Sequence, residues 1–281
     1  MVARRSAQRL PAPISGEALT PQPSGLLVIG GLDSSGVSTS GVLRLDSDGK
    51  LRSVGRLAEP LHDAAAATLP GGVLVFGGGS AATIDRVESL AAGQPGRVIG
   101  HLPTSRSDLS SVAINGSAYV LAGYDGQTAV GSVLRTSDGQ HFAEVAQLPT
   151  PVRYAAVATL GKTIYALGGE LADGQDFDGI QAFDIGSHHA RIVGHLPQPV
   201  SHASAVELGG RIYLLGGRRV GSASDLILKL DPRRDRASVA GHLPLPVSNA
   251  AAATAGGTGY LIGGLDSQGV PLSSIVTVRL G

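Results

Sequence analysis

The sequence contains no cysteine and no tryptophan, and charged residues make up only 16% of it. Without cysteine, the chain can form no disulfide, no thiol nucleophile and no cysteine-based metal site. The 22 basic residues balance the 22 acidic ones, so the chain has no overall electrostatic attraction to nucleic acid or to an anionic membrane. Its longest apolar runs, such as residues 26–31, are far shorter than the roughly 20 residues that cross a bilayer. We therefore expect neither nucleic-acid binding nor membrane insertion.

Glycine, in contrast, is abundant, with 41 of 281 residues, and much of it recurs in pairs that follow short apolar runs. The pairs, or the variant Ala-Gly, begin at Gly30, Gly77, Ala122, Gly168, Gly216 and Gly263. A Leu-Pro pair or a variant of it begins 20 residues before each of them, at Leu10, Leu57, Leu102, Leu148, Leu196 and Leu243. Two markers that keep this distance six times indicate an internal repeat that covers the whole chain.

Each repeat has the pattern of four short strands. In the fourth repeat, residues 154–160 and 163–169 are apolar runs that flank a Gly-Lys turn, which is typical of a β-hairpin. Two further runs follow at 180–184 and 190–196, and all of these lengths suit strands rather than helices. The first strand of each repeat is rich in Ala and Ser, as expected where strands converge on an axis. We predict an all-β fold, a six-bladed β-propeller of four-stranded antiparallel blades, as a single domain over residues 1–281.

The two ends of the chain are predicted to share one blade. After Gly263 only a third strand follows, at residues 274–280, and a fourth strand is missing. Residues 4–13 align with residues 51–60, which precede the second repeat's strands in the same way. We expect the N-terminal strand, about residues 3–9, to complete the sixth blade and close the ring, which removes an exposed sheet edge.

These motifs resemble the kelch repeat, and the resemblance extends over the whole chain. It rests on the Gly pair after an apolar strand, on Tyr-Asp-Gly at 124–126, and on Arg106 after a Leu-Pro pair. The Tyr and Trp that kelch motifs usually carry later in the blade are replaced here, for example by Phe183 and Phe142. The sequence is therefore similar to a divergent, Ala- and Gly-rich kelch set of bacterial type. The copper oxidases of this fold use a Tyr-Cys crosslink, which a chain without cysteine cannot form.

The resemblance implies that the loops after the Gly pairs and the loops after Leu-Pro lie on one rim of the channel, with the hairpin turns on the opposite rim. Binding residues concentrate in loops on a rigid scaffold. The polar residues of this rim differ from repeat to repeat, and among them four arginines are candidates to clamp a carboxylate or an acidic peptide. The candidate ligand-binding residues are His62, Asp63, Arg106, Ser107, Asp108, Tyr124, Asp125, Arg153, Tyr154, Glu170, Ser201, His202, Arg218, Arg219, Ser248, Asn249 and Asp266.

The histidines do not predict a metal site. His101, His195 and His242 occupy the same position of three different repeats, so the propeller keeps them apart and we expect local hydrogen bonds. His62 and His202 are expected to face each other across the channel, but two histidines without a third clear ligand do not make a zinc site. The acidic loop at 169–179 lacks EF-hand spacing. We expect no metal and no other cofactor.

Three functions remain open at this point. The first is a non-catalytic binding module whose polar rim holds a protein segment or a glycan. The second follows from the resemblance, because some six-bladed kelch proteins are sugar mutarotases; the acid and base would come from Asp63, Asp108, Glu170 or His202. The third is a scaffold or an engineered propeller without a natural ligand. The sequence contains no G-x-S-x-G nucleophile elbow, no H-E-x-x-H zinc motif and no phosphate-binding P-loop. We therefore favour the binding module.

The sequence says little about oligomeric state or compartment. We expect a monomer. The N-terminal MVARRSAQRLPAP has basic residues without a following apolar stretch, so it does not have the pattern of an intact signal peptide. An extracytoplasmic bacterial setting is suggested by the resemblance alone.

Overall fold

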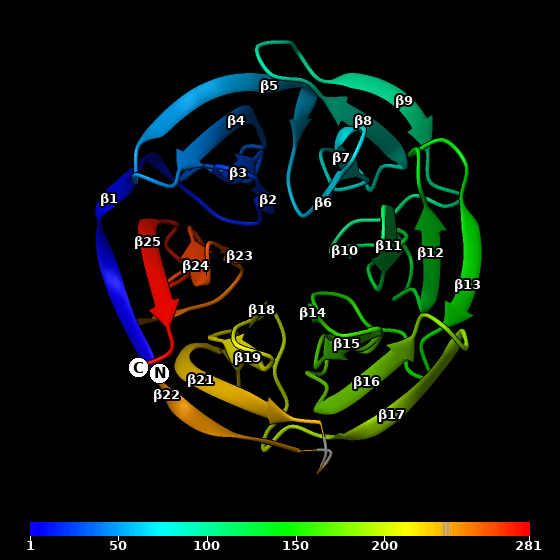
Figure 1. Cartoon of the computed structure of the whole chain (residues 1–281), viewed down its shortest axis with the longest axis vertical. Coiled ribbons are helices and arrows are strands. Elements are labelled where there is room, and N and C mark those ends of the chain that lie inside the picture. Colours follow the sequence, from blue (N-terminus) through cyan, green and yellow to red (C-terminus); the bar gives the residue numbers. More distant parts are fainter. Residues whose placement is uncertain (233, 235) are drawn as a thin grey trace.

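The computed structural model describes residues 1–232, 234 and 236–281. Antiparallel β-sheets stand around a central axis and follow one another in the order of the sequence (Figure 1). Among the described residues, no helix is long and apolar enough to cross a membrane. The predicted all-β chain of four-stranded antiparallel sheets is thus confirmed.

Four of the sheets are separate and have four strands each. In three of these sheets the first strand along the chain lies nearest the axis (Figure 1). In the last sheet β23 takes this place, and β1 joins at the outer edge. They consist of β2 (Ala18–Gln22), β3 (Gly25–Ile29), β4 (Thr39–Asp46) and β5 (Leu51–Leu61); β6 (Ala65–Leu69), β7 (Gly72–Phe76), β8 (Arg86–Leu90) and β9 (Arg97–His101); β10 (Ser110–Ile114), β11 (Ser117–Leu121), β12 (Ser132–Thr136) and β13 (Ala143–Gln147); and β23 (Ala251–Ala255), β24 (Thr258–Ile262), β25 (Leu272–Arg279) and β1 (Val2–Ile14).

The remaining sheet has nine strands and consists of two antiparallel runs that meet at their outer strands. The runs join where His195 of β17 pairs in parallel with Arg236 of β22. A two-residue strand, β20, pairs only with β21 and lies off the main path. The strands are β14 (Ala156–Leu160), β15 (Thr163–Leu167), β16 (Gly179–Asp184), β17 (His189–His195), β22 (Arg236–Val247), β21 (Ser222–Asp231), β20 (Arg218–Arg219), β19 (Ile212–Leu215) and β18 (Ser204–Glu207).

The first and last strands of the chain pair with each other. β1 runs antiparallel to β25, from Val2 opposite Arg279 to Ile14 opposite Leu272, and both termini lie at the same place on the ring (Figure 1). The strand is longer than the predicted residues 3–9, because Leu10 and Ile14 at its far end are buried in the core. An outer edge strand also tolerates prolines, since their missing N–H groups are not needed by a neighbour.

The apolar core lies between neighbouring sheets. Leu27 and Ile29 of β3, for example, share one cluster with Ala66 of β6 and Val75 of β7. Fully burying a Leu or Ile side chain contributes roughly 1.5–3 kcal/mol, so each interface between sheets contributes several such terms. The strands nearest the axis carry small residues, as in the Ala-rich β6, which lets them converge.

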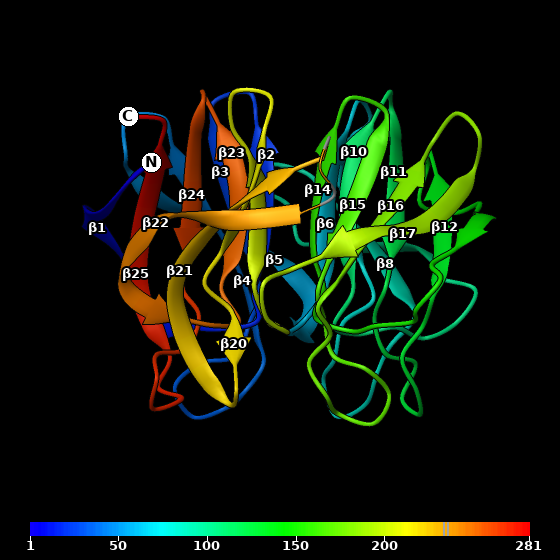
Figure 2. The same cartoon turned by 90° about the horizontal axis from the view of Figure 1, so that it is seen from below.

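The two rims of the ring differ in their loops. Short hairpin turns, such as the turn between β23 and β24, lie on one rim, whereas β20 and the long loops lie on the other (Figure 2). Isolated bridges on the long-loop rim join Ser107 to Tyr124 and Ser201 to Arg218. Residues that follow Leu-Pro therefore adjoin residues that follow the Gly pairs, as the resemblance implies.

Candidate functional site

A closed ring of backbone hydrogen bonds surrounds the channel on the long-loop rim. One residue from each repeat takes part, and each N–H donates to the carbonyl of the equivalent residue in the preceding repeat, over 2.7 to 3.1 Å. The φ angles of these residues lie between +48° and +63°, in the left-handed region. They are Gly16, Asp63, Asp108, Tyr154, His202 and Asn249.

The left-handed conformation is strained for residues other than glycine. Because every repeat adopts it and closes the same hydrogen bond, the scaffold itself accounts for the conformation. Glycine would satisfy the backbone with the least strain, yet only Gly16 does so. The other five positions carry side chains of different kinds, which the backbone ring does not require.

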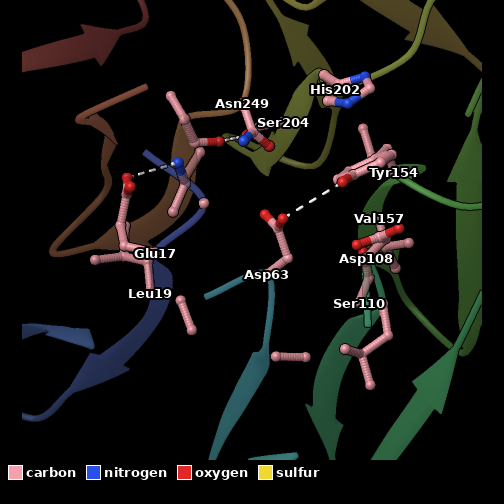
Figure 3. A pocket seen from close by; sticks show the side chains of 18 of the residues that line it. Glu17, Leu19, Asp63, Asp108, Ser110, Tyr154, Val157, His202, Ser204 and Asn249 are labelled. Carbon is pink, nitrogen blue, oxygen red and sulfur yellow. Dashed lines mark hydrogen bonds between the residues drawn. The ribbon is translucent and has the colours of Figure 1, made fainter. Parts of the chain in front are cut away.

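All five of these side chains line a cavity of about 160 Å³ at the channel mouth (Figure 3). Asp63 projects toward its centre, and Asp108 and Tyr154 lie on one side (Figure 3). A Cβ atom on Gly16 would lie 2.4 Å from Oδ1 of Asp63, so this glycine leaves the space that the carboxyl group occupies. His202 and Asn249 line the same cavity.

The carboxyl group of Asp63 has an unusual environment. Burial, and then the neighbouring charge of Asp108, raises its pKa to about 7. The Tyr154 hydroxyl donates to Oδ2 of Asp63 over 3.4 Å. At neutral pH this group is therefore present as both acid and carboxylate, and it can donate or accept a hydrogen bond.

Tyr154 and His202 form a stacked pair, with ring centroids 3.7 Å apart. Ser201 Oγ lies 2.8 Å from Nδ1 of His202. Burial, followed by the charge of Arg218, lowers the pKa of His202 to about 3, and burial raises the pKa of Tyr154. Both rings are thus neutral at pH 7, which makes His202 a hydrogen-bonding group rather than a cation.

Two of the four candidate arginines are held by one buried carboxylate. Glu170 is 4% exposed and accepts hydrogen bonds from both Arg153 and Arg218. Arg153 also lies 3.6 Å from Asp108, and its guanidinium carbon is 4.9 Å from the ring centroid of Tyr124. These two cations therefore shape the wall beside the cavity, with their charge already paired.

Arg106 does not reach the channel. It is 1% exposed, and its guanidinium donates to the carbonyl and hydroxyl oxygens of Ser132 over 3.0 and 2.6 Å. The expectation that it clamps a ligand is therefore corrected to a structural role. Asp125 and Asp266 are similar, because their carboxylates accept backbone N–H groups of their own loops.

The other candidates are spread around the rim. Ser107 and Ser248 are buried and form isolated bridges with Tyr124 and Leu265, and His62 lies outside the cavity lining with its Nδ1 2.8 Å from Ser38 Oγ. Arg219 is also buried and outside the lining. The expected local hydrogen bonds of the repeated histidines are confirmed, since His101, His195 and His242 each lie 3.0 Å from an aspartate.

Glu17 also lines the cavity, although it is not among the residues predicted from the sequence; it is 6% exposed. Its Oε1 accepts the N–H of Ala251 over 3.1 Å, and Oε2 has no hydrogen-bond partner among the described residues. Burial raises its pKa to about 8. The repeat register contains the signal, because the equivalent positions hold only apolar residues: Ala64, Leu109, Ala155, Ala203 and Ala250.

The described part of the chain contains no group of three or more His, Cys, Asp or Glu side chains arranged to hold a metal ion. Two of the residues considered for such a site, His62 and His202, do not both line the cavity. Asp63, Asp108, Tyr154, His202 and Asn249 offer hydrogen-bond donors and acceptors at the mouth, and the carboxyl group of Asp63 can also exchange a proton near neutral pH.

Comparison with known proteins places these features in context. No protein-family model matches the chain. The chain is similar to Kelch-like protein 35 of Mus musculus, with 36% identity over 74 residues, a stretch that is 26% of this chain and 13% of that protein. Its fold is similar to that of the solved structure "Structure of YjhT", with a TM-score of 0.82 and 16% identity over 97% of both chains. At this identity, the second likeness bears on the fold alone.

Proposed function

Because the chain folds as a kelch-repeat β-propeller, we propose that it is one six-bladed domain whose channel mouth binds the end of a glycan. The count of six treats each run of the nine-stranded sheet as a blade. The six residues that close the hydrogen-bonded ring support this count. The proposed function is binding without catalysis. The alternative ligand is a protein segment that inserts one polar side chain into the same mouth.

The observation that carries this proposal is the lining of the mouth by five polar side chains of four kinds, all on left-handed backbone. The cavity, at about 160 Å³, is smaller than the about 300 Å³ at which pockets for drug-sized ligands begin, so it accepts one small group. Carboxyl, phenol, imidazole and amide groups around it both donate and accept hydrogen bonds. Sugar hydroxyls do the same, so a sugar ring can satisfy groups on several sides at once.

One observation favours a second function, a sugar isomerase or mutarotase at the same mouth. The pKa of Asp63 is about 7, which suits a general acid or base at neutral pH. Asp108 lies close enough to raise that pKa and is itself a candidate partner. The two functions share their ligand and differ only in turnover.

Thermal denaturation in the presence of neutral sugars, short oligosaccharides and peptides tests the proposal. A ligand at 100 times its dissociation constant adds about 2.7 kcal/mol to stability, which is readily detected. We expect a sugar to stabilise the parent and not the Asp63→Asn variant, while Thr159→Val at the opposite mouth keeps the response. Anomer exchange followed by NMR with the same sugar then separates the enzyme from the binder. A response that survives Asp63→Asn, or a response to peptides alone, contradicts glycan binding at this mouth.

A further inference from the structure

Of the four arginines on or near the long-loop rim, only Arg219 has two buried guanidinium nitrogens without a hydrogen-bond partner among the described residues, whereas Arg106 has one, Nε. Arg106 donates to Ser132, and the other two are held by Glu170. Arg219 is 8% exposed, yet its Nε and Nη2 atoms are buried without any hydrogen-bond partner within residues 1–232, 234 and 236–281. Strand alternation in β20 directs it to the face opposite Arg218, away from Glu170.

An unpaired buried cation is costly, because nothing replaces the water that it has lost. The pKa of Arg219 is lowered, and burial is the cause. A guanidinium presents a planar set of donors that matches a carboxylate, sulfate or phosphate. The guanidinium of Arg219 therefore offers N–H donors that lack an acceptor among the described residues.

The hairpin that carries Arg219 is strained at its tip. Val220 has a φ of +49° and is 96% exposed, and Gly221 follows it in the turn between β20 and β21. A β-branched residue in the left-handed region is an outlier, and so exposed a side chain gains little packing in return. Such strain clusters at ligand sites. The hairpin lies on the long-loop rim, where the proposed ligand enters (Figure 2).

We propose that Arg219 binds an oxyanion, a carboxylate, sulfate or phosphate, at the hairpin between β20 and β21. This site is separate from the channel mouth, since Arg219 lies outside the cavity lining and on the face of β20 opposite Arg218.

Thermal denaturation with inorganic and simple organic anions tests the inference. The parent, Arg219→Met and Arg211→Met are melted in chloride, acetate, sulfate and phosphate at constant ionic strength. Arg211→Met is the matched control, because Arg211 is an exposed arginine directly before the neighbouring strand β19. Sulfate and phosphate stabilise proteins in general, so the informative quantity is the difference between variants.

We expect at least one oxyanion to raise the melting temperature of the parent and of Arg211→Met by about 2 to 4 °C more than that of Arg219→Met. In chloride, Arg219→Met should melt at or above the parent temperature, because it loses an unpaired buried charge. Equal responses of all three proteins overturn the inference. Should Arg219→Met fail to fold, Arg219→Gln removes the charge but keeps a polar side chain, and an undiminished response of that variant overturns the inference as well.

The same proteins separate this inference from the proposed function. Stabilisation by a neutral sugar depends on Asp63 and should persist in Arg219→Met. If neutral sugars fail while the oxyanion response still requires Arg219, the glycan proposal fails and the anion site stands. The anion with the largest difference between the parent and Arg219→Met, among acetate, sulfate and phosphate, identifies the anionic group that the site prefers.

Discussion

The two ends of the channel are built from the same inner strands, but their side chains serve different purposes. The mouth on the long-loop rim has a cavity of about 160 Å³ and the opposite mouth one of about 280 Å³. Threonines line the opposite mouth, and their hydroxyls donate to neighbouring strands, as Thr68 does to Pro21 O over 2.6 Å and Thr254 to Glu207 O over 2.8 Å. Both cavities include one ring of residues: Leu19, Ala66, Ser111, Val157, Ala205 and Ala252.

This contrast shows that the larger cavity is not the better candidate site. At the opposite mouth, side chains join strand to strand, so the scaffold needs them. At the long-loop mouth, main-chain groups already close the ring. The side chains there are not needed for that purpose and can serve a ligand.

The largest expected effect comes from breaking the frame on which both mouths depend. Deleting residues 1–9 removes most of the strand that pairs with β25 and exposes that edge. We expect a loss of about 4 kcal/mol, or about 10 °C in melting temperature, and association through the free edge. Calorimetry and light scattering measure both. A truncated chain that melts and elutes like the parent contradicts the role of β1 in closure.

The next largest effect is the stability difference between replacing a buried arginine, Arg106, and replacing an arginine beside the mouth, Arg153. Arg106→Met leaves the buried oxygens of Ser132 without their donors, and we expect it to cost about 2–4 kcal/mol. Arg153→Met leaves Glu170 paired with Arg218 and should cost about 1 kcal/mol or less. Urea denaturation of the two variants compares them. Equal losses would mean that Arg153 is also a structural residue.

One substitution at each mouth compares the two ends directly. Asp63→Gly relieves the left-handed backbone and removes a buried carboxyl group, so stability should stay level or rise by about 1 kcal/mol while sugar binding is lost. Thr68→Val leaves Pro21 O without its donor and should lower stability by about 1 kcal/mol with binding intact. Chemical denaturation and calorimetric titration measure the pair. The reverse pattern would assign the ligand to the opposite mouth.

The smallest expected effect, about 1 kcal/mol or less between pH 7 and pH 8, is a pH dependence at the junction between the last and first sheets. The pKa of Glu17 rises from 4.5 to about 8 on folding, so the folded chain holds an extra proton. Its contribution is complete below about pH 4.5 and is lost at roughly 1.4 kcal/mol per pH unit as the pH rises toward 8. Asp63 acts in the same way only up to about pH 7. Between pH 7 and pH 8 we expect Glu17→Gln to flatten the slope of unfolding free energy that the parent shows; an unchanged slope would exclude Glu17 as its source.

Spacing alone predicts much of the fold, because the two markers keep their distance in every repeat. The same register assigns residues to a rim, and it places Asp63, Tyr154 and Asn249 at equivalent positions of three repeats. It also predicts that β1 completes the last sheet, since residues 4–13 align with 51–60. These successes share one cause: backbone position in a repeat protein follows from sequence position.

Two features of the site emerge only when the repeats are compared position by position. Arg106 lies four residues after Leu102, where the other five repeats hold apolar residues that are all buried: Ile14, Leu61, Val152, Val200 and Val247. Arg153 lies five residues after Leu148, one position further along, and contacts Glu170 beside the cavity. Glu17 is the second case, because it is an acidic residue at a position that is otherwise apolar.

The closed hydrogen-bonded ring has a consequence for directed evolution. Six positions share one backbone conformation and contribute only main-chain groups to it: Gly16, Asp63, Asp108, Tyr154, His202 and Asn249. Randomising them changes the shape and polarity of the mouth without removing a bond that holds the ring together. A library at these positions therefore keeps one scaffold and varies one recognition surface, with Gly, Asn and Asp as the least strained choices.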